Sequence, residues 1–195
     1  VDALLRQAGV LRAGSVEALF DLAMAFAGQS PPRSRKTVVL TNAGGPGILA
    51  VDAMEPWGLE LPELSPATVE RLKPLFPPEA SIRNPLDMIA SANPAGYRRA
   101  LDALLDDPEI DSAVAIYVPI PPNDPVEVTD SIVASASTHP EKPVFAVVMG
   151  HEGLPRGRAE LQEVGIPAYL FPESAVRALA ARVRHEEWRR RPPSS

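Results

Sequence analysis

Short apolar runs alternate with segments of helical periodicity along most of this chain, and this alternation constrains its fold more than any other feature. A continuous apolar run is typical of a strand that is buried on both faces of a parallel sheet. Candidate strands lie at residues 37–41, 59–61, 111–118, 143–149 and 167–171. Candidate helices lie at residues 48–54, 67–76, 95–105, 124–137, 153–164 and 173–190. The alternation predicts an α/β protein whose sheet carries helices on both faces.

The number of candidate strands narrows the topology further. Right-handed crossovers leave few ways of connecting five parallel strands, and a chain of 195 residues suits the flavodoxin-like arrangement. We therefore predict a flavodoxin-like, three-layer α/β/α fold with a mostly parallel five-stranded sheet.

The chain divides into an N-terminal helical part, a short linker and one α/β domain. Residues 1–29 are amphipathic, with Ser15 placed to cap a helix that carries apolar residues at helical spacing. Residues 30–36 are rich in proline, serine and basic residues, which indicates a linker or exposed turn. Residues 37–191 hold the predicted domain. The opening residues resemble a helix entered midway, so we interpret 1–29 as a connector from a missing preceding domain of a longer polypeptide.

Composition excludes several classes of protein. The chain has no cysteine, which rules out disulfides, iron–sulfur clusters and a thiol nucleophile and fits a cytoplasmic protein. A formal net charge of −6 argues against nucleic-acid binding. No apolar stretch approaches the length that a membrane span needs. We expect no metal site, because no second His or Cys lies at ligand spacing from any of the three histidines.

The most informative segment is the glycine-rich loop at residues 42–47, which follows the first candidate strand and opens a helix. Glycines let a backbone approach an anion closely, and a helix N-terminus offers unpaired N–H groups. The spacing fits neither a Walker motif nor a dinucleotide fingerprint. An anion site and a tight βα turn both remain open at this point. The loop residues concerned are Asn42, Ala43, Gly44, Gly45 and Gly47.

Three other segments are candidates for a role at the same edge of the sheet. Asn84 and Asp87 belong to a loop that we interpret as structural, because an Asp close to proline is usually a turn or cap residue. A stiff, proline-dense segment that could wall a pocket contains Pro119, Ile120, Pro121 and Pro122. Its other interpretation is a turn into a helix capped by Asp124. His151 follows another strand, and its role stays open.

No Ser-His-Asp order and no nucleophile elbow is present, so the chain carries no self-contained catalytic set. The motifs at 41–47, 61–65 and 84–87, followed by those at 142–144, 165–167 and 171–176, nevertheless occur in a recognisable order. Together with the opening helices, they resemble the NDP-forming acyl-CoA synthetase family. The resemblance covers nearly the whole chain and points to the second of that family's two succinyl-CoA-ligase-like flavodoxin domains.

This resemblance implies a reaction in which acyl-CoA, ADP and phosphate are converted reversibly to acid, ATP and CoA through a phosphohistidine. The phosphohistidine-bearing, CoA-binding and ATP-grasp domains would be partners in the parent enzyme, which would use CoA, ADP or ATP, and magnesium. No cofactor is expected in this chain, and we expect it to be inert alone. The helix after the 42–47 loop is similar to the family's "power helix", with Gly44, Gly45 and Gly47 supplying N–H groups and Asn42 an amide. The 119–122 segment matches a glycine-rich loop near the acid substrate, and its prolines argue against succinate.

Two other interpretations remain. Synthetase-like regions without a catalytic histidine also occur as ligand-sensing modules of protein lysine acetyltransferases, and a free-standing small-molecule binder would share this fold. We also expect the isolated domain to expose a surface that normally packs on a neighbour, and so to self-associate.

Overall fold

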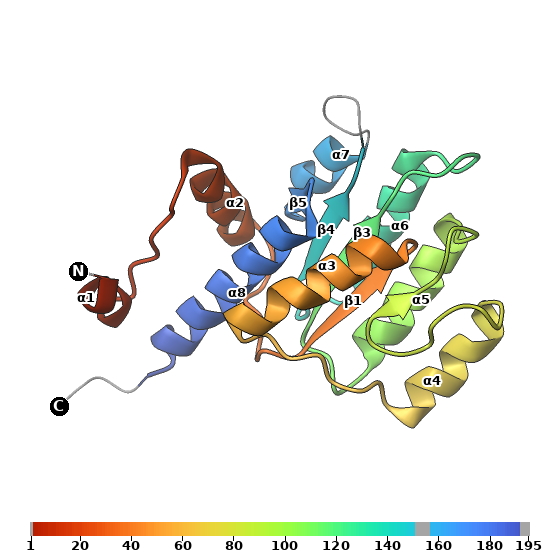
Figure 1. The fold of residues 1–195 in the computed structure, drawn as a ribbon, viewed down its shortest axis with the longest axis horizontal. Helices are drawn as coiled ribbons and strands as arrows, with labels where there is room; N and C mark the ends of the chain where they lie inside the picture. The colour runs from red at the N-terminus through yellow and green to blue at the C-terminus, as the bar shows by residue number, and fades with distance from the viewer. Residues whose placement is uncertain (1, 151–156, 192–195) are drawn as a thin grey trace.

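The computed structural model describes residues 2–150 and 157–191, which form one five-stranded sheet and the helices around it (Figure 1). The strand order is β2-β1-β3-β4-β5, and every neighbouring pair is parallel. This order is the flavodoxin-like one, so the predicted fold class is confirmed. The strands are β1 (Thr37–Thr41), β2 (Leu86–Asp87), β3 (Ser112–Tyr117), β4 (Val144–Val148) and β5 (Ala168–Tyr169).

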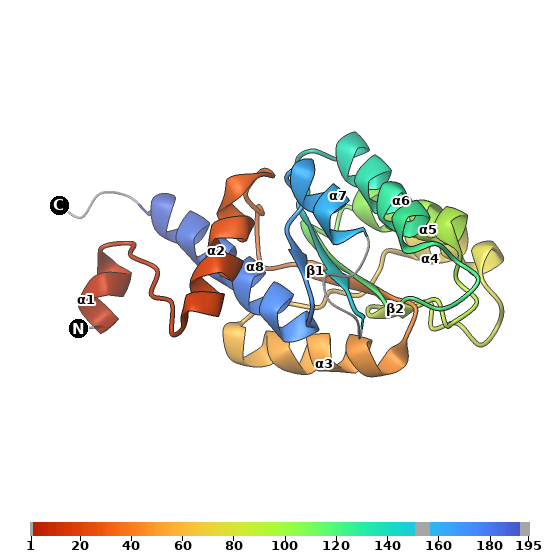
Figure 2. The ribbon, with the colours of Figure 1, turned by 90° about the horizontal axis from the view of Figure 1, so that it is seen from above.

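Successive strand residues point to opposite faces of the sheet, and both faces are buried. In β1, Val38 and Leu40 pack on one side and Val39 on the other, and β3 and β4 alternate in the same way. Figure 2 shows the two helical layers on opposite sides of the sheet. One layer contains α4 (Pro66–Leu72), α5 (Pro94–Asp106), α6 (Pro125–Thr138) and α7 (Arg158–Glu163), and the other contains α3 (Gly44–Met54) and α8 (Pro172–Arg189).

The predicted strand at 59–61 is wrong. Only Glu60 pairs with the sheet region, through a single parallel bridge to Lys36 just before β1. Pro62 has no N–H to continue a ladder, and the side chain of Asn84 instead bonds the start of β1. The second strand is β2, which pairs with the end of β1 through Leu40 and Thr41.

Helix boundaries follow local capping chemistry. The hydroxyl of Ser15 accepts a hydrogen bond from the N–H of Ala18 at 3.1 Å, and Asp124 accepts one from Val126 at 3.0 Å, so both predicted N-caps are confirmed. The predicted helix at 67–76 ends at Leu72, because Pro74 cannot continue it, and a 3₁₀ turn (Lys73–Leu75) follows. Another 3₁₀ turn (Glu55–Trp57) follows α3.

The N-terminal part contains two helices, α1 (Asp2–Gln7) and α2 (Val16–Ala27), separated by a non-helical stretch in which Gly9 has φ 73°. Helix α2 packs along α8. The segment at 30–36 is bound to the domain rather than exposed throughout. The Arg35 guanidinium bonds both carboxylate oxygens of Glu187 at 2.6 and 2.7 Å and the carbonyl of Gly58 at 2.9 Å. The hydroxyl of Ser34 donates to Asp111.

Candidate functional site

Three predicted loops meet at one edge of the sheet, because parallel strands end at a common edge. Thr41, the last residue of β1, pairs with Asp87 of β2 and with Ile116 of β3. The glycine-rich loop, the end of β2 and the 119–122 segment therefore lie beside one another. Asn84 is the exception, since its amide donates to the carbonyl of Thr37 at 2.9 Å and accepts from the N–H of Val39 at 3.0 Å. It lies near the opposite end of β1, where it supports the strand.

The first turn of α3 presents free N–H groups at this edge. The helix begins at Gly44, and its N-cap residue, Ala43, makes no side-chain capping bond. The N–H of Ala43 donates to the hydroxyl of Thr41 at 3.0 Å, and Pro46 has no N–H. Within the described part of the chain, the N–H groups of Gly44 and Gly45 find no acceptor, and both residues are exposed. These donors, with the positive end of the helix dipole, suit an anion.

The three glycines of this turn differ in what a side chain at each position would meet. A Cβ atom on Gly47 would lie 2.9 Å from Cγ2 of Thr41, so glycine lets α3 pack closely on β1. A Cβ atom on Gly44 would lie 3.1 Å from Oδ2 of Asp87. A Cβ atom on Gly45 would meet nothing within 4 Å. Gly45 therefore leaves open space beside the free N–H groups, whereas Gly47 is a packing residue.

Asn42 joins the ends of β1 and β3. Its Nδ2 donates to the carbonyl of Val118 at 2.8 Å, and its Oδ1 accepts from the N–H of Val118 at 2.9 Å. The residue is 2% exposed. Its two polar side-chain atoms are thus engaged in holding the loops together. The prediction that Asn42 offers its amide to a phosphate stays a prediction.

Asp87 lies beside the glycine-rich loop, and its structural role stays a prediction. Its Oδ1 accepts from the N–H of Ile89 at 2.9 Å and supports a turn in which Ile89 has φ 57°. Its Oδ2 faces the first turn of α3, since it lies 3.1 Å from where a Cβ atom on Gly44 would be. A carboxylate beside a helix N-terminus stabilises the helix and also opposes the binding of a second anion. No local pattern in the sequence signals this proximity.

The 119–122 segment lies over a buried aromatic pair. Tyr117 at the end of β3 and Tyr97 of α5 contact edge to face at 5.6 Å, and Tyr97 donates its hydroxyl to the carbonyl of Ile116 at 2.8 Å. Burial raises the pKa of each tyrosine, most strongly that of Tyr97, so both stay neutral. Asn123 ties the segment to the loop before α5, because its side-chain amide donates to the carbonyl of Ala92 at 2.8 Å. Pro121 and Pro122 are exposed.

Neither a metal centre nor a membrane span is found among the described residues. Over 2–150 and 157–191, no group of three or more His, Asp or Glu side chains could hold a metal ion. In that same part of the chain, no helix has the length and apolar character to cross a bilayer. His151 lies outside the described residues, so its role stays open.

Comparison with known proteins identifies longer relatives. The family model described as the Ligase-CoA domain matches residues 37–191. The α subunit of acetate–CoA ligase [ADP-forming] II from Pyrococcus furiosus is 37% identical, over 93% of this chain and 40% of the relative. The 4-hydroxybutyrate–CoA ligase [ADP-forming] of Nitrosopumilus maritimus is 30% identical, over 96% of this chain and 26% of the relative. This chain thus spans well under half of either relative.

Solved structures agree with this relationship. The dinucleotide-forming acetyl-coenzyme A synthetase 1 of Ca. Korarchaeum cryptofilum superposes with a TM-score of 0.90 at 28% identity, over 96% of this chain and 41% of that one. It has been solved in its apo form and in complex with phosphate and ADP. On the family match and these relatives, the chain belongs to the NDP-forming acyl-CoA synthetase family, of which it carries the Ligase-CoA domain.

Proposed function

We propose that this chain completes the phosphoryl-transfer site of an ADP-forming acyl-CoA synthetase, and that the first turn of α3 stabilises the transferring phosphoryl group. The observation that carries the proposal is the pair of free N–H groups at Gly44 and Gly45, at the ligand-binding edge of the sheet. Donors fixed by a helix stabilise developing negative charge without reorganising during the reaction. The phosphoryl group would be carried by a histidine on an adjacent domain.

The isolated chain is then only half of a site. Asp87 places a negative charge beside the same helix turn, so free phosphate binds weakly until the adjacent domain adds its own contacts. CoA and ADP or ATP would be bound by the CoA-binding and ATP-grasp domains, with magnesium at the nucleotide. We expect a cytoplasmic enzyme whose activity requires all of these domains. The ligase names of the relatives favour this role over a regulatory module.

The 119–122 segment would line the acid substrate. Its prolines restrict the backbone, and it begins two residues after the buried Tyr117. A stiff segment that offers few N–H donors suits an apolar acyl group better than a dicarboxylate. We therefore propose a monocarboxylic acid as the substrate class.

The test is turnover by the complete enzyme with Gly45→Leu. A helical side chain leans toward the N-terminus, so leucine at this position covers the free N–H groups. Because a Cβ atom at Gly45 meets nothing within 4 Å, the fold should be preserved. We expect acid- and CoA-dependent ATP turnover, and phosphohistidine formation, to fall by about 100-fold, as for the loss of an oxyanion donor.

The matched control is Asp52→Leu, which adds an equally bulky side chain to an exposed position of the same helix, far from its first turn. Its phosphohistidine formation should equal that of the wild type. If Gly45→Leu retains the wild-type melting temperature and wild-type turnover, the first turn of α3 does not contact the phosphoryl group and the proposal fails.

A further inference from the structure

Helix α2 is attached to the domain partly by polar contacts. Its buried residues are Asp21 and Ala25. The carboxylate of Asp21 pairs with Arg177 of α8 at 3.0 Å, and its carbonyl accepts from the hydroxyl of Tyr169 at 3.1 Å. The carbonyl of Ala25 accepts from Arg182. Apolar side chains add to these contacts, since Met24 packs against the core under α8 and Phe26 contacts His185 and Arg182 of α8, but much of the apolar stripe of α2 does not face the core as it would in a usual surface helix.

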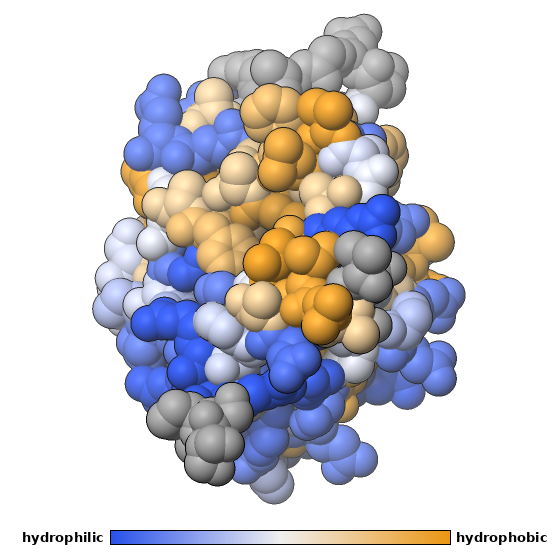
Figure 3. Space-filling view, turned by 90° about the vertical axis from the view of Figure 1, so that its left-hand side faces the viewer, coloured by the Kyte–Doolittle hydropathy of each residue, from blue (hydrophilic) through white to orange (hydrophobic). Residues whose placement is uncertain are grey.

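The apolar side of α2 consequently points outward. Val16, Leu19 and Phe20 lie on one face at helical spacing and are 71%, 56% and 65% exposed. Leu4 and Val10, in the N-terminal arm (residues 2–29), are also exposed. Figure 3 shows hydrophobic residues gathered in broad patches on this side of the molecule. Of the ten large apolar side chains that are exposed within the described ranges, six belong to the arm. Such clustering marks an interaction surface.

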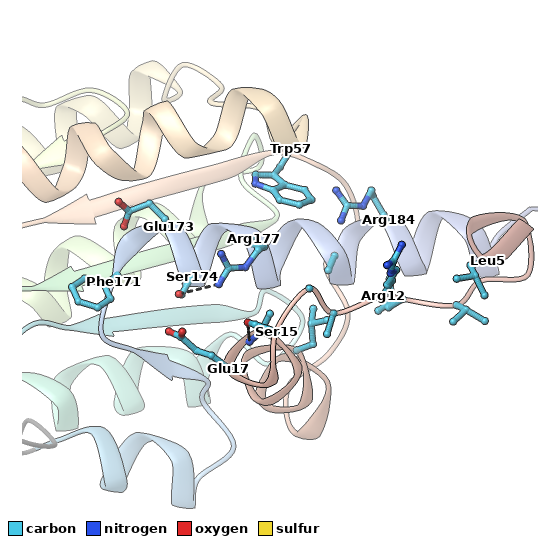
Figure 4. A pocket seen from close by; sticks show the side chains of 17 residues that line it. Leu5, Arg12, Ser15, Glu17, Trp57, Phe171, Glu173, Ser174, Arg177 and Arg184 are labelled. Atoms are coloured by element: carbon cyan, nitrogen blue, oxygen red, sulfur yellow. Dashed lines mark hydrogen bonds between the residues drawn. The ribbon is translucent and has the colours of Figure 1, made fainter. Parts of the chain in front are cut away.

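A separate cavity of about 980 Å³ lies between the arm and α8 (Figure 4), and the α2 residues that line it are Glu17, Ala18 and Leu22 rather than those of the outer face. Leu5, Val10 and Leu11 line it from the arm, and Trp57 and Phe171 from the domain. Charged side chains, among them Arg177 and Arg184, stand around these apolar residues, and the guanidinium of Arg184 stacks over the Trp57 ring at 4.7 Å. An apolar centre with a charged surround is the anatomy of a protein interface.

The longer relatives indicate what covers this surface. The arm lies outside the matched Ligase-CoA domain, which begins at residue 37. The superposition on the Korarchaeum synthetase nevertheless includes 96% of this chain, so most of the arm is placed similarly in a chain of which this one covers only 41%. The arm is therefore matched in a chain that contains further protein.

We propose that the outer face of the arm, formed by Val16, Leu19 and Phe20, is covered by an adjoining domain of the same synthetase. The covering surface is apolar at its centre. This docking accounts for three large apolar side chains of α2 that its own domain leaves more than half exposed. The inference rests on the proposed function only in taking this chain as one part of a multidomain enzyme.

The experiment is hydroxyl-radical footprinting of Phe20, in the isolated chain at a concentration where sedimentation shows a monomer and in the complete enzyme. Phe20 should be labelled in the isolated chain and about tenfold less in the complete enzyme, since labelling follows exposed area and an interface core excludes water. Leu19→Glu should restore labelling of Phe20 in the complete enzyme. The control Ala67→Glu adds the same charge at an exposed position of α4, in the opposite layer, and should leave the protection unchanged.

Equal labelling of Phe20 in both samples would overturn the proposal. Protection that disappears when the complete enzyme is diluted to a single copy would assign the face to a second copy, and would also overturn it. Footprinting needs no turnover. If Gly45→Leu keeps wild-type turnover while Phe20 is protected in the complete enzyme, only the phosphoryl-transfer role is rejected. If Gly45→Leu loses turnover while Phe20 is labelled equally in both samples, only the docking proposal is rejected.

Discussion

Gly28 packs directly against the backbone of the domain, and replacing it tests how the arm is held. A Cβ atom on Gly28 would lie 2.0 Å from the carbonyl oxygen of Gly165, with two more backbone atoms of Gly165 within 3 Å. No change of rotamer relieves a contact with backbone. Restoring the 3.4 Å of ordinary contact requires a displacement of 1.4 Å. We expect Gly28→Ala to push the end of α2 away from the loop that precedes β5.

The neighbouring contacts set the size of the effect. The side chain of Gln29 donates to the carbonyl of Val144 at 2.6 Å and accepts from its N–H at 2.8 Å, and the carbonyl of Gln29 accepts from Arg182. A shift of 1.4 Å breaks this pair. Overpacking alone costs 1–3 kcal/mol and each net hydrogen bond about 1, so we expect a loss of about 3 kcal/mol in the free energy of unfolding. The melting temperature should fall by about 6–12 °C.

Thermal and urea unfolding measure this loss, and hydrogen exchange reports whether α2 loosens. Gly14→Ala is the control, because a Cβ atom on Gly14 meets nothing within 4 Å in the same arm. It should change stability by less than about 0.5 kcal/mol. The reasoning is refuted if Gly28→Ala matches Gly14→Ala in stability and in the exchange of α2 amides.

Two other substitutions test the loop contacts at the candidate site and the loss of stability at low pH. Asn42→Ala should cost about 2 kcal/mol in urea unfolding, because it leaves the N–H and carbonyl of Val118 without their partners; unchanged stability would mean that water replaces the amide. Burial alone would raise the pKa of Asp107, but hydrogen bonds from the N–H groups of Glu109 and Ser65 outweigh it and hold that pKa below its ordinary value. Its stabilisation is present above the unfolded pKa of about 3.9 and is lost as the pH falls through the lowered value. Urea midpoints should therefore fall more steeply below pH 4 for the wild type than for Asp107→Asn, and parallel profiles would contradict this assignment.

Local patterns were sufficient for much of the fold. The runs at Val38–Val39 and across β3 and β4 are apolar on both faces, which is diagnostic of a buried parallel strand, and Ser15 and Asp124 mark helix starts by their own chemistry. Strand β2 could not be predicted, because two residues have no periodicity. It exists only because Leu86 and Asp87 meet the end of β1.

The candidate site likewise has features that the sequence predicts and features that depend on long-range contacts. The glycine-rich loop after a strand predicts an anion-facing helix turn, and the structure places free N–H groups there. The engagement of Asn42 with Val118 and the approach of Asp87 to Gly44 join residues that are dozens of positions apart. Such contacts depend on how strands are ordered in space, which no short window of sequence contains.

Neighbouring residues and their periodicity are enough to predict the parallel α/β class, the glycine-rich turn and the amphipathic character of α2. The direction in which α2 faces depends instead on contacts with distant parts of the chain. Its polar residue Asp21 finds Arg177 on α8, far along the chain, and this pairing turns Leu19 and Phe20 outward. Periodicity reveals that a helix has two faces, whereas long-range partners select the one that is buried.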